Sequence, residues 1–290
     1  LMTEGMSLAG MAEMPLVVVV SMRAGPSTGV PTYTAQSDLH FVMNAGQGEF
    51  TRLVIAPGDL EQAYFWSATS LSLAWKYQIP AILLSDKTLS ESAYSFNLEE
   101  ARDIPDISPV LADDEGDYRR YARTSDGISP LAFPPMKGAT VKANGYAHLT
   151  SGITTEDASE VKAVQDKSLL KEKRLIGELE GLPAVKTYGS EDGSVALLCW
   201  GSNKGVCSEV GEGFGLRVVQ PVVLSPFPTI QFEEALQGVE RTISVETNST
   251  GQLARLIRSC GFEADDLILK YDARPFSVDD LEKRLLEVTR

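Results

Sequence analysis

The sequence predicts an α/β protein built on two mainly parallel sheets, and three observations support this fold class. Residues 16–20 form an apolar, mostly β-branched run that is too short to span a membrane and is typical of a strand buried on both faces. A helical segment at 60–77 separates a strand at 52–56 from another at 80–84, which is the order of a parallel βαβ unit. The same alternation returns after residue 187.

The first unit is expected to span residues 1–104. It opens with a helix over 1–14, and because nothing caps the start of that helix we expect a preceding segment to be missing from the sequence. A short helix is expected at 37–44, where His40 lies among apolar neighbours and is expected to pack rather than react. Asp59 is expected to be the N-cap of the helix at 60–77.

Residues 105–187 break the alternation, and we expect a linker arm without a core of its own. Prolines interrupt any long helix in its first part, at Pro105, Pro109, Pro130, Pro134 and Pro135. The acidic run at 113–117 is expected to be solvated surface. A charged helix is expected at 155–180, with Lys171-Glu-Lys-Arg174 on its exposed face.

Residues 188–290 regain the α/β alternation as a second unit. With helices between and after them, strands are expected at 195–200, 216–224, 242–246 and 267–270. Pro221 lies inside the second of these strands. Because proline cannot donate to a ladder, we expect an edge strand or a bulge there.

Composition excludes several classes of protein. The formal net charge of −14 argues against a nucleic-acid partner, which normally requires a basic surface. No apolar stretch reaches the length of a transmembrane helix, so no membrane partner is expected. Three cysteines without short pairing spacings indicate a reducing compartment, and we expect a cytoplasmic protein. With two histidines and no Cys-x-x-Cys motif, no metal ligand is assigned to this chain.

The loop after the first strand is the leading candidate site. Arg23 follows the strand directly, and Gly25-Pro-Ser-Thr-Gly29 makes a tight turn with N–H groups free to face a ligand. Ligands of open α/β sheets bind outside the carboxyl ends of the strands. A guanidinium there can hold a carboxylate through two parallel hydrogen bonds, which lysine cannot copy. On spacing alone, a solvated arginine followed by an ordinary turn is equally open.

Other segments carry weaker signals. Residues 201–205 (Gly-Ser-Asn-Lys-Gly) could present N–H groups to an anion, but a tight connection between strand and helix is favoured. The loop at 248–252 is expected to face a partner subunit, and Cys199 and Cys260 are expected to pack. Nothing supports Glu13 as a catalytic carboxylate. No catalytic residue is therefore assigned, and the chemistry of any enzyme would belong to a cofactor or another subunit.

The sequence motif of the first loop is specific enough to indicate a family. The run from Arg23 to Thr32 reads Arg-x-Gly-Pro-Ser-Thr-Gly-x-Pro-Thr and is followed by Gln36 and Asp38. It resembles the signature of the α subunit of 2-oxoacid:ferredoxin oxidoreductases, which are thiamine-diphosphate enzymes.

Later motifs extend the resemblance over nearly the whole chain. Residues 200–205, 246–253 and 272–276 resemble the transketolase C-terminal-type domain of this family, and Asp126-Gly-Ile-Ser-Pro130 lies between the two parts. Ala273 stands where family members often have glycine, which bears on a turn rather than on chemistry. The resemblance thus implies a partial pyrimidine-type thiamine-diphosphate domain at 1–104 and a transketolase C-terminal-type domain at 188–290.

The resemblance also implies an activity and its partners. The activity is CoA-dependent oxidative decarboxylation of a 2-oxoacid, with 2-oxoglutarate as the leading substrate and pyruvate or branched-chain 2-oxoacids left open. A β subunit would hold the diphosphate of the cofactor, Mg²⁺ and a [4Fe–4S] cluster, and ferredoxin would accept the electrons. A γ subunit or a fused γ-type domain is left open.

The resemblance assigns the site residues one by one. Arg23 and Thr28 match the substrate-contacting positions of the family, and Gly25, Pro26, Ser27 and Gly29 would line the cofactor. The glutamate that activates the aminopyrimidine would lie in the missing segment. The alternative is a non-catalytic α/β interaction or scaffold subunit whose loops bind a partner.

Overall fold

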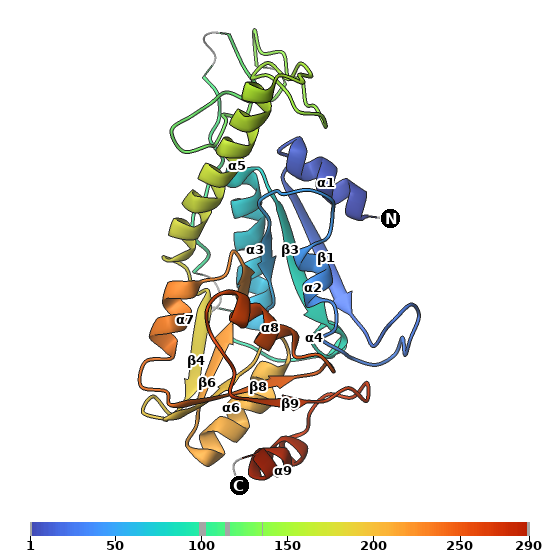
Figure 1. Cartoon of the computed structure of the whole chain (residues 1–290), viewed down its shortest axis with the longest axis vertical. Coiled ribbons are helices and arrows are strands. Elements are labelled where there is room, and N and C mark those ends of the chain that lie inside the picture. Colours follow the sequence, from blue (N-terminus) through green and yellow to red (C-terminus); the bar gives the residue numbers. More distant parts are fainter. Residues whose placement is uncertain (1, 99–102, 114–116, 135, 289–290) are drawn as a thin grey trace.

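Two sheets with flanking helices form the framework of the computed structural model, which describes residues 2–98, 103–113, 117–134 and 136–288. Figure 1 shows the first sheet above the second, with the C-terminal helix at the bottom. The strand order is β1-β3-β2-β7 in the first sheet and β4-β6-β5-β8-β9 in the second. Leu1, Pro135 and the centre of the acidic run, 114–116, lie outside the described residues, so the expectations for them stay predictions.

A parallel βαβ unit organises the first sheet, as predicted. β1 (Leu16–Met22) and β2 (Leu53–Ile55) both pair in parallel with the central β3 (Pro80–Asp86). α3 (Leu60–Tyr77) connects β2 to β3, and the Asp59 carboxylate caps it by accepting the Gln62 N–H at 2.8 Å. The shorter helices of this part are α1 (Thr3–Met11), α2 (Leu39–Met43) and α4 (Lys87–Glu91).

β1 is not buried on both faces, which corrects the prediction for this strand. Among the described strands it pairs only with β3, so it lies at the edge of the sheet, and Val19 is 67% exposed. The buried strands are β2 and the central β3. A valine-rich run fits either place, because composition does not show how many neighbours a strand will pair with.

The second sheet is parallel except at one edge. β6 (Arg217–Pro221), β5 (Val195–Leu198), β8 (Arg241–Glu246) and β9 (Asp266–Leu269) run in parallel, and β4 (Val185–Gly189) pairs with β6 in the antiparallel sense. Its helices are α6 (Asn203–Phe214), α7 (Thr229–Ala235), α8 (Gln252–Ser259) and α9 (Val278–Val288). The sequence did not predict β4, because Val-Lys-Thr-Tyr-Gly contains no apolar run.

The single strand expected at 216–224 is two strands in two different sheets. β6 ends at Pro221 and lies between β4 and β5, so the predicted edge position is wrong. Proline is tolerated there because the chain leaves the ladder at this residue. After Val222 the chain enters β7 (Val223–Ser225), which pairs with β2 of the first sheet. The main chain therefore crosses from one sheet to the other within a few residues.

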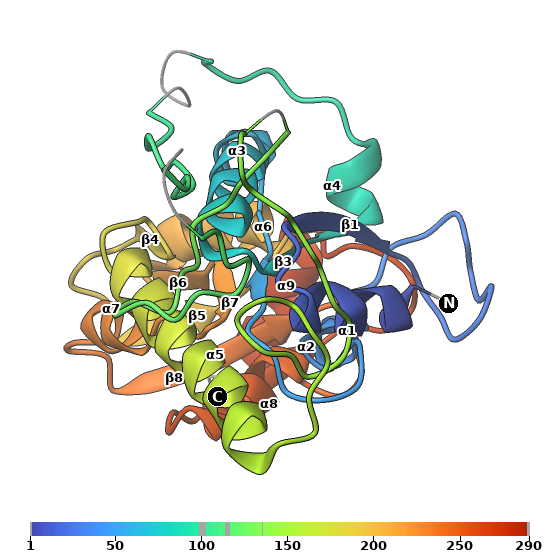
Figure 2. The same ribbon diagram turned by 90° about the horizontal axis from the view of Figure 1, so that it is seen from above.

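The charged helix expected at 155–180 exists as α5 (Ala158–Leu179), with the Asp157 carboxylate as its N-cap. Figures 1 and 2 show it as a long helix alongside the first sheet. Near its end it contacts α3, where Lys76 Nζ lies 2.8 Å from Glu178 Oε1. Leu175 and Leu179 are buried in one cluster with apolar residues of β2 and α3. Lys171, which we expected on an exposed face, is also buried. The three-part division at 104 and 187 stays a prediction.

The two sheets meet at the side chain of Gln36, which is fully buried. Its Nε2 donates to the Trp200 carbonyl at 2.6 Å, and its Oε1 accepts from Asn203 Nδ2 at 2.8 Å and from the Thr247 N–H at 3.1 Å. The Gln36 N–H donates to the Thr247 carbonyl at 2.8 Å. All of these partners belong to loops and helices of the second sheet. One apolar cluster, which includes Ile82 and Trp200, packs across the same boundary.

Replacing Gln36 should therefore loosen the contact between the sheets. Gln36→Met keeps much of the side-chain volume but leaves the Thr247 N–H, the Trp200 carbonyl and Asn203 without this partner. Because a buried polar group without a partner costs about 1–3 kcal/mol, we expect a loss of that size in the free energy of unfolding, measured by urea titration. The control is Gln237→Met, at an exposed position; an equal loss in both variants would contradict this account.

Candidate functional site

The candidate loop lies where the sequence predicted it, at the carboxyl end of β1. Arg23 is exposed, and its guanidinium folds over its own loop. Nε donates to the Thr28 carbonyl at 3.2 Å and Nη2 donates to the Ser27 carbonyl at 3.4 Å. The ion pairs formed among the described residues do not involve Arg23. The guanidinium is thus held by neutral carbonyl groups, and its charge is not cancelled by a bonded carboxylate.

The turn after Arg23 depends on glycine at one position. The Val30 N–H donates to the Ala24 carbonyl at 2.8 Å, which closes the loop. Gly29 has a φ of +54°, and a Cβ atom there would lie 1.9 Å from the Ala24 oxygen. Residues 25–33 are all exposed, including the hydroxyl-bearing Thr28. The loop therefore has a defined shape at its base and presents small side chains to the outside.

Asp38, the last residue of the predicted motif, lies close enough to Arg23 to feel its charge. Burial raises the pKa of the Asp38 carboxyl, and the Arg23 charge lowers it by less. Because the two side chains form no ion pair in the described structure, Arg23 remains available to another anion.

Residues 201–205 form a tight connection inside the protein, the alternative that the sequence favoured. Lys204 Nζ lies 2.7 Å from Asp59 Oδ2, and the Ser202 N–H donates to Asp86 Oδ2 at 3.3 Å. Asn203 is buried against Gln36. These groups are occupied by the first sheet's own residues, so the segment is not an anion site.

Most of the loop at 248–252 faces inward, but Ser249 and Thr250 are exposed, so its contact with a partner subunit stays a prediction. Asn248 Nδ2 donates to the Gln36 carbonyl at 3.1 Å, and Gln252 Nε2 donates to the Ser37 carbonyl at 2.7 Å. The buried Glu246 carboxylate accepts the N–H groups of Leu253 and Ala254 at 2.8 and 3.0 Å and so caps α8. The side chains of Asn248 and Gln252 therefore help to hold the two sheets together.

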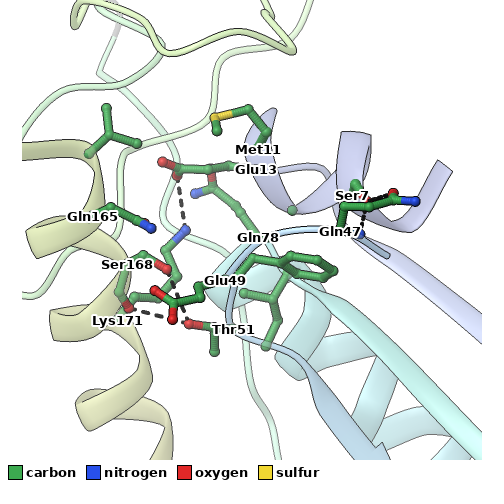
Figure 3. Close-up of a pocket in the computed structure, with 15 residues that line it drawn as sticks. Ser7, Met11, Glu13, Gln47, Glu49, Thr51, Gln78, Gln165, Ser168 and Lys171 are labelled. Carbon is green, nitrogen blue, oxygen red and sulfur yellow. Dashed lines mark hydrogen bonds and ion pairs between the residues drawn. The ribbon is translucent and has the colours of Figure 1, made fainter. Parts of the chain in front are cut away.

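A second polar cluster lies at the opposite end of β1, beside a cavity of about 180 Å³. Figure 3 shows Lys171 and Ser168 of α5 facing Glu13 and Thr51 across this cavity. Glu13 Oε1 lies 2.7 Å from Lys167 Nζ, and Oε2 lies 3.0 Å from Lys171 Nζ. All three charged side chains are buried.

This cluster is structural rather than catalytic. Burial by itself raises the pKa of Glu13, but the charges of Lys171 and Lys167 outweigh it and hold the pKa at about 2. Each carboxylate oxygen pairs with a buried lysine that keeps the group ionised, which fits a structural role. The spacing of Lys167, Lys171 and Leu175 on one helix face is the sequence signal for this buried stripe, which the prediction of an exposed face at Lys171 missed.

Among the described residues, no group of three or more histidine, cysteine, aspartate or glutamate side chains is arranged to hold a metal ion. Within the same residues, no helix has the length and apolar character needed to cross a membrane. Cys199 is fully buried in a packed cluster, as expected.

A family model for pyruvate flavodoxin/ferredoxin oxidoreductases, described as thiamine diphosphate-binding, matches residues 1–167. The chain belongs to this family. It is 36% identical over 301 residues to the 2-oxoacid:ferredoxin oxidoreductase subunit alpha of Saccharolobus solfataricus, covering 100% of this chain and 47% of that one. It is 38% identical over 299 residues to the 2-oxoacid:ferredoxin oxidoreductase 2 subunit alpha of Aeropyrum pernix, covering 99% and 46%.

A solved structure extends this match to three dimensions. The 2-oxoglutarate:ferredoxin oxidoreductase from Magnetococcus marinus, with 2-oxoglutarate, coenzyme A and succinyl-CoA bound, superposes with a TM-score of 0.87 at 28% identity, covering 100% of this chain and 51% of that one. The chain thus spans about half the length of the curated relatives it matches. The predicted family and its thiamine-diphosphate-binding, mostly parallel α/β fold are confirmed. The Arg23 loop lies inside the part that the family model covers.

The structural role of Glu13 can be tested with Glu13→Gln. Removing one member of a buried charge cluster should lower the free energy of unfolding at pH 7 by about 3–5 kcal/mol. In the native chain the carboxylate's contribution is present above pH 4.5 and is lost as the pH falls toward about 2, because the folded pKa is depressed. The difference between the two proteins should therefore shrink as the pH falls.

Urea unfolding at several pH values measures this difference. Glu49→Gln is the control, because Glu49 lines the same cavity but is exposed. A pH-independent difference, or an equal effect at Glu49, would show that Glu13 does not act through the buried lysines.

Proposed function

We propose that this chain is the part of a 2-oxoacid:ferredoxin oxidoreductase α subunit that holds the carboxylate of the substrate. The reaction is the CoA-dependent oxidative decarboxylation of a 2-oxoacid. The supporting observation is Arg23, an exposed guanidinium fixed by two loop carbonyls at the carboxyl end of β1. Family membership supplies the reaction class.

Arg23 is assigned to the C1 carboxylate, and Thr28 to a supporting hydrogen bond. Two of the guanidinium's N–H groups are occupied by Thr28 and Ser27 carbonyls, which fixes the plane of the fork. The remaining N–H groups can bind a carboxylate in that plane. A fixed carboxylate matters because the bond to the departing carbon dioxide must be oriented before it breaks.

The cofactor is assigned to the small residues of the same loop. Gly25, Pro26, Ser27 and Gly29 are exposed, and their small side chains leave room for a flat ring to approach the backbone. Bound thiamine diphosphate would supply the electron-accepting centre that decarboxylation of a 2-oxoacid requires. The described residues contain no acidic cluster for a metal ion, so we assign Mg²⁺ and the diphosphate to a β subunit.

The partner subunits are assigned from the exposure of the loop. The loop at 25–33 is open to solvent in this chain, whereas decarboxylation proceeds best in a site closed to water. We therefore expect a β subunit, carrying a [4Fe–4S] cluster, to cover the loop, with ferredoxin as electron acceptor in the cytoplasm; a γ subunit is left open. 2-Oxoglutarate is the proposed substrate, because the matching solved structure contains it.

Arg23→Ala in the assembled enzyme tests the assignment. Loss of a charge-assisted hydrogen bond, about 1.5–3 kcal/mol, should lower kcat/KM for the 2-oxoacid by about 10- to 150-fold. Arg23→Lys keeps the charge but not the fork, so it should restore only part of the activity. Thiamine diphosphate affinity, measured separately, should change little.

Arg258→Ala is the matched control, because this arginine is exposed on α8. Wild-type kinetics in Arg23→Ala, or a loss confined to cofactor binding, would contradict the carboxylate assignment. Failure of the chain to support turnover with any β subunit would favour the scaffold alternative.

A further inference from the structure

A second guanidinium, from the other sheet, lies on the loop that carries Arg23. The Cζ atom of Arg274 is 3.4 Å from the centroid of the Tyr33 ring. The Tyr33 carbonyl accepts the Ala24 N–H at 3.4 Å, and Ala24 is the residue next to Arg23. Figure 1 shows the segment between β9 and α9 extending toward the loop after β1. Arg274 therefore contacts the loop close to where Arg23 leaves the strand.

The turn that presents Arg274 is held by charged contacts. Lys270 Nζ lies 2.9 Å from Asp272 Oδ2 and 2.9 Å from Asp280 Oδ2. The Arg274 N–H donates to Asp272 Oδ1 at 3.0 Å. Between them Ala273 has a φ of +63°, a left-handed conformation that a residue with a side chain adopts only when its neighbours hold it there. The position of Arg274 is thus set by its own turn before it meets Tyr33.

The loop needs such an external contact. Residues 25–33 are all exposed, and the hydrogen bonds from Arg23 and Val30 close the loop on itself without tying its outer part to either sheet. The next fixed point along the chain is Gln36, which is also held by the second sheet. The contact between Tyr33 and Arg274 lies between the closed turn that ends at Val30 and the buried Gln36.

We propose that Arg274 is a positioning residue for the reaction: by stacking on Tyr33 it holds the loop at 24–34 in the shape that presents Arg23 to the substrate carboxylate. This proposal rests on the proposed function of Arg23. The guanidinium carbon lies over the ring at 3.4 Å from its centroid, and a planar guanidinium can stack on a ring in a way that lysine cannot. The ion pairs among the described residues do not include Arg274, so no bonded carboxylate competes with Tyr33 for its guanidinium.

Steady-state kinetics on the assembled enzyme test this role. Arg274→Ala should raise KM for the 2-oxoacid by about two- to fivefold, the range of an exposed cation–π contact, and leave kcat and KM for coenzyme A near wild type. Arg274→Lys should restore part of the loss. Tyr33→Phe keeps the ring and should behave as wild type, whereas Tyr33→Ala should match Arg274→Ala. The double variant should be no worse than either single one.

A second measurement reports the loop itself. Amide hydrogen exchange in residues 24–34 should be faster in Arg274→Ala and in Tyr33→Ala, and unchanged in the control Arg258→Ala. An Arg274→Ala enzyme with unchanged KM and unchanged exchange, beside an impaired Arg23→Ala enzyme, would overturn this inference and leave the proposed function intact. Unchanged kinetics in both variants would overturn both. If Arg274→Ala does not assemble, Tyr33→Ala and Arg274→Lys decide the matter by the same readouts.

Discussion

The buried amide of Gln36 is the contact on which the arrangement of this molecule depends. An amide offers donors and an acceptor, and here both are satisfied by main-chain and side-chain groups of the second sheet. Such a group is costly to bury without its partners, so only one relative position of the two sheets is favourable. The apolar cluster that includes Ile82 and Trp200 buries apolar surface across the same boundary, but apolar contact alone is not directional.

This contact also explains why the motif segments at 200–205 and 246–253 are rich in polar residues. Asn203, Thr247 and Asn248 read like parts of ligand loops, yet they are buried and bonded to Gln36. Asn and Thr are frequent both in ligand sites and in buried hydrogen-bond networks, because each offers a donor and an acceptor on a short side chain. The polar character that suggested an anion site belongs to the contact between the sheets.

Charge is distributed differently at the two ends of β1. At the start of the strand, Glu13 is enclosed by Lys167 and Lys171 and has its hydrogen bonds satisfied. At the carboxyl end, Arg23 is exposed and bonded only to neutral carbonyls. The first arrangement balances buried charges within the fold, whereas the second leaves a charge available to a ligand. Ligands of open α/β sheets also bind at the carboxyl ends of the strands, which is where Arg23 lies.

The sequence by itself determined the α/β class, the βαβ unit around α3, the cap at Asp59 and the candidate loop from Arg23 to Gly29. These features depend on local periodicity, on turn residues and on backbone sterics, which neighbouring residues specify. Only the tertiary structure decided that β1 lies at an edge, that the run at 216–224 divides between two sheets, and that Lys171 is buried. Each of these outcomes depends on partners distant in the chain. A valine does not specify how many strands will pair beside it, and a lysine on a helix is buried only if a carboxylate such as Glu13 meets it there.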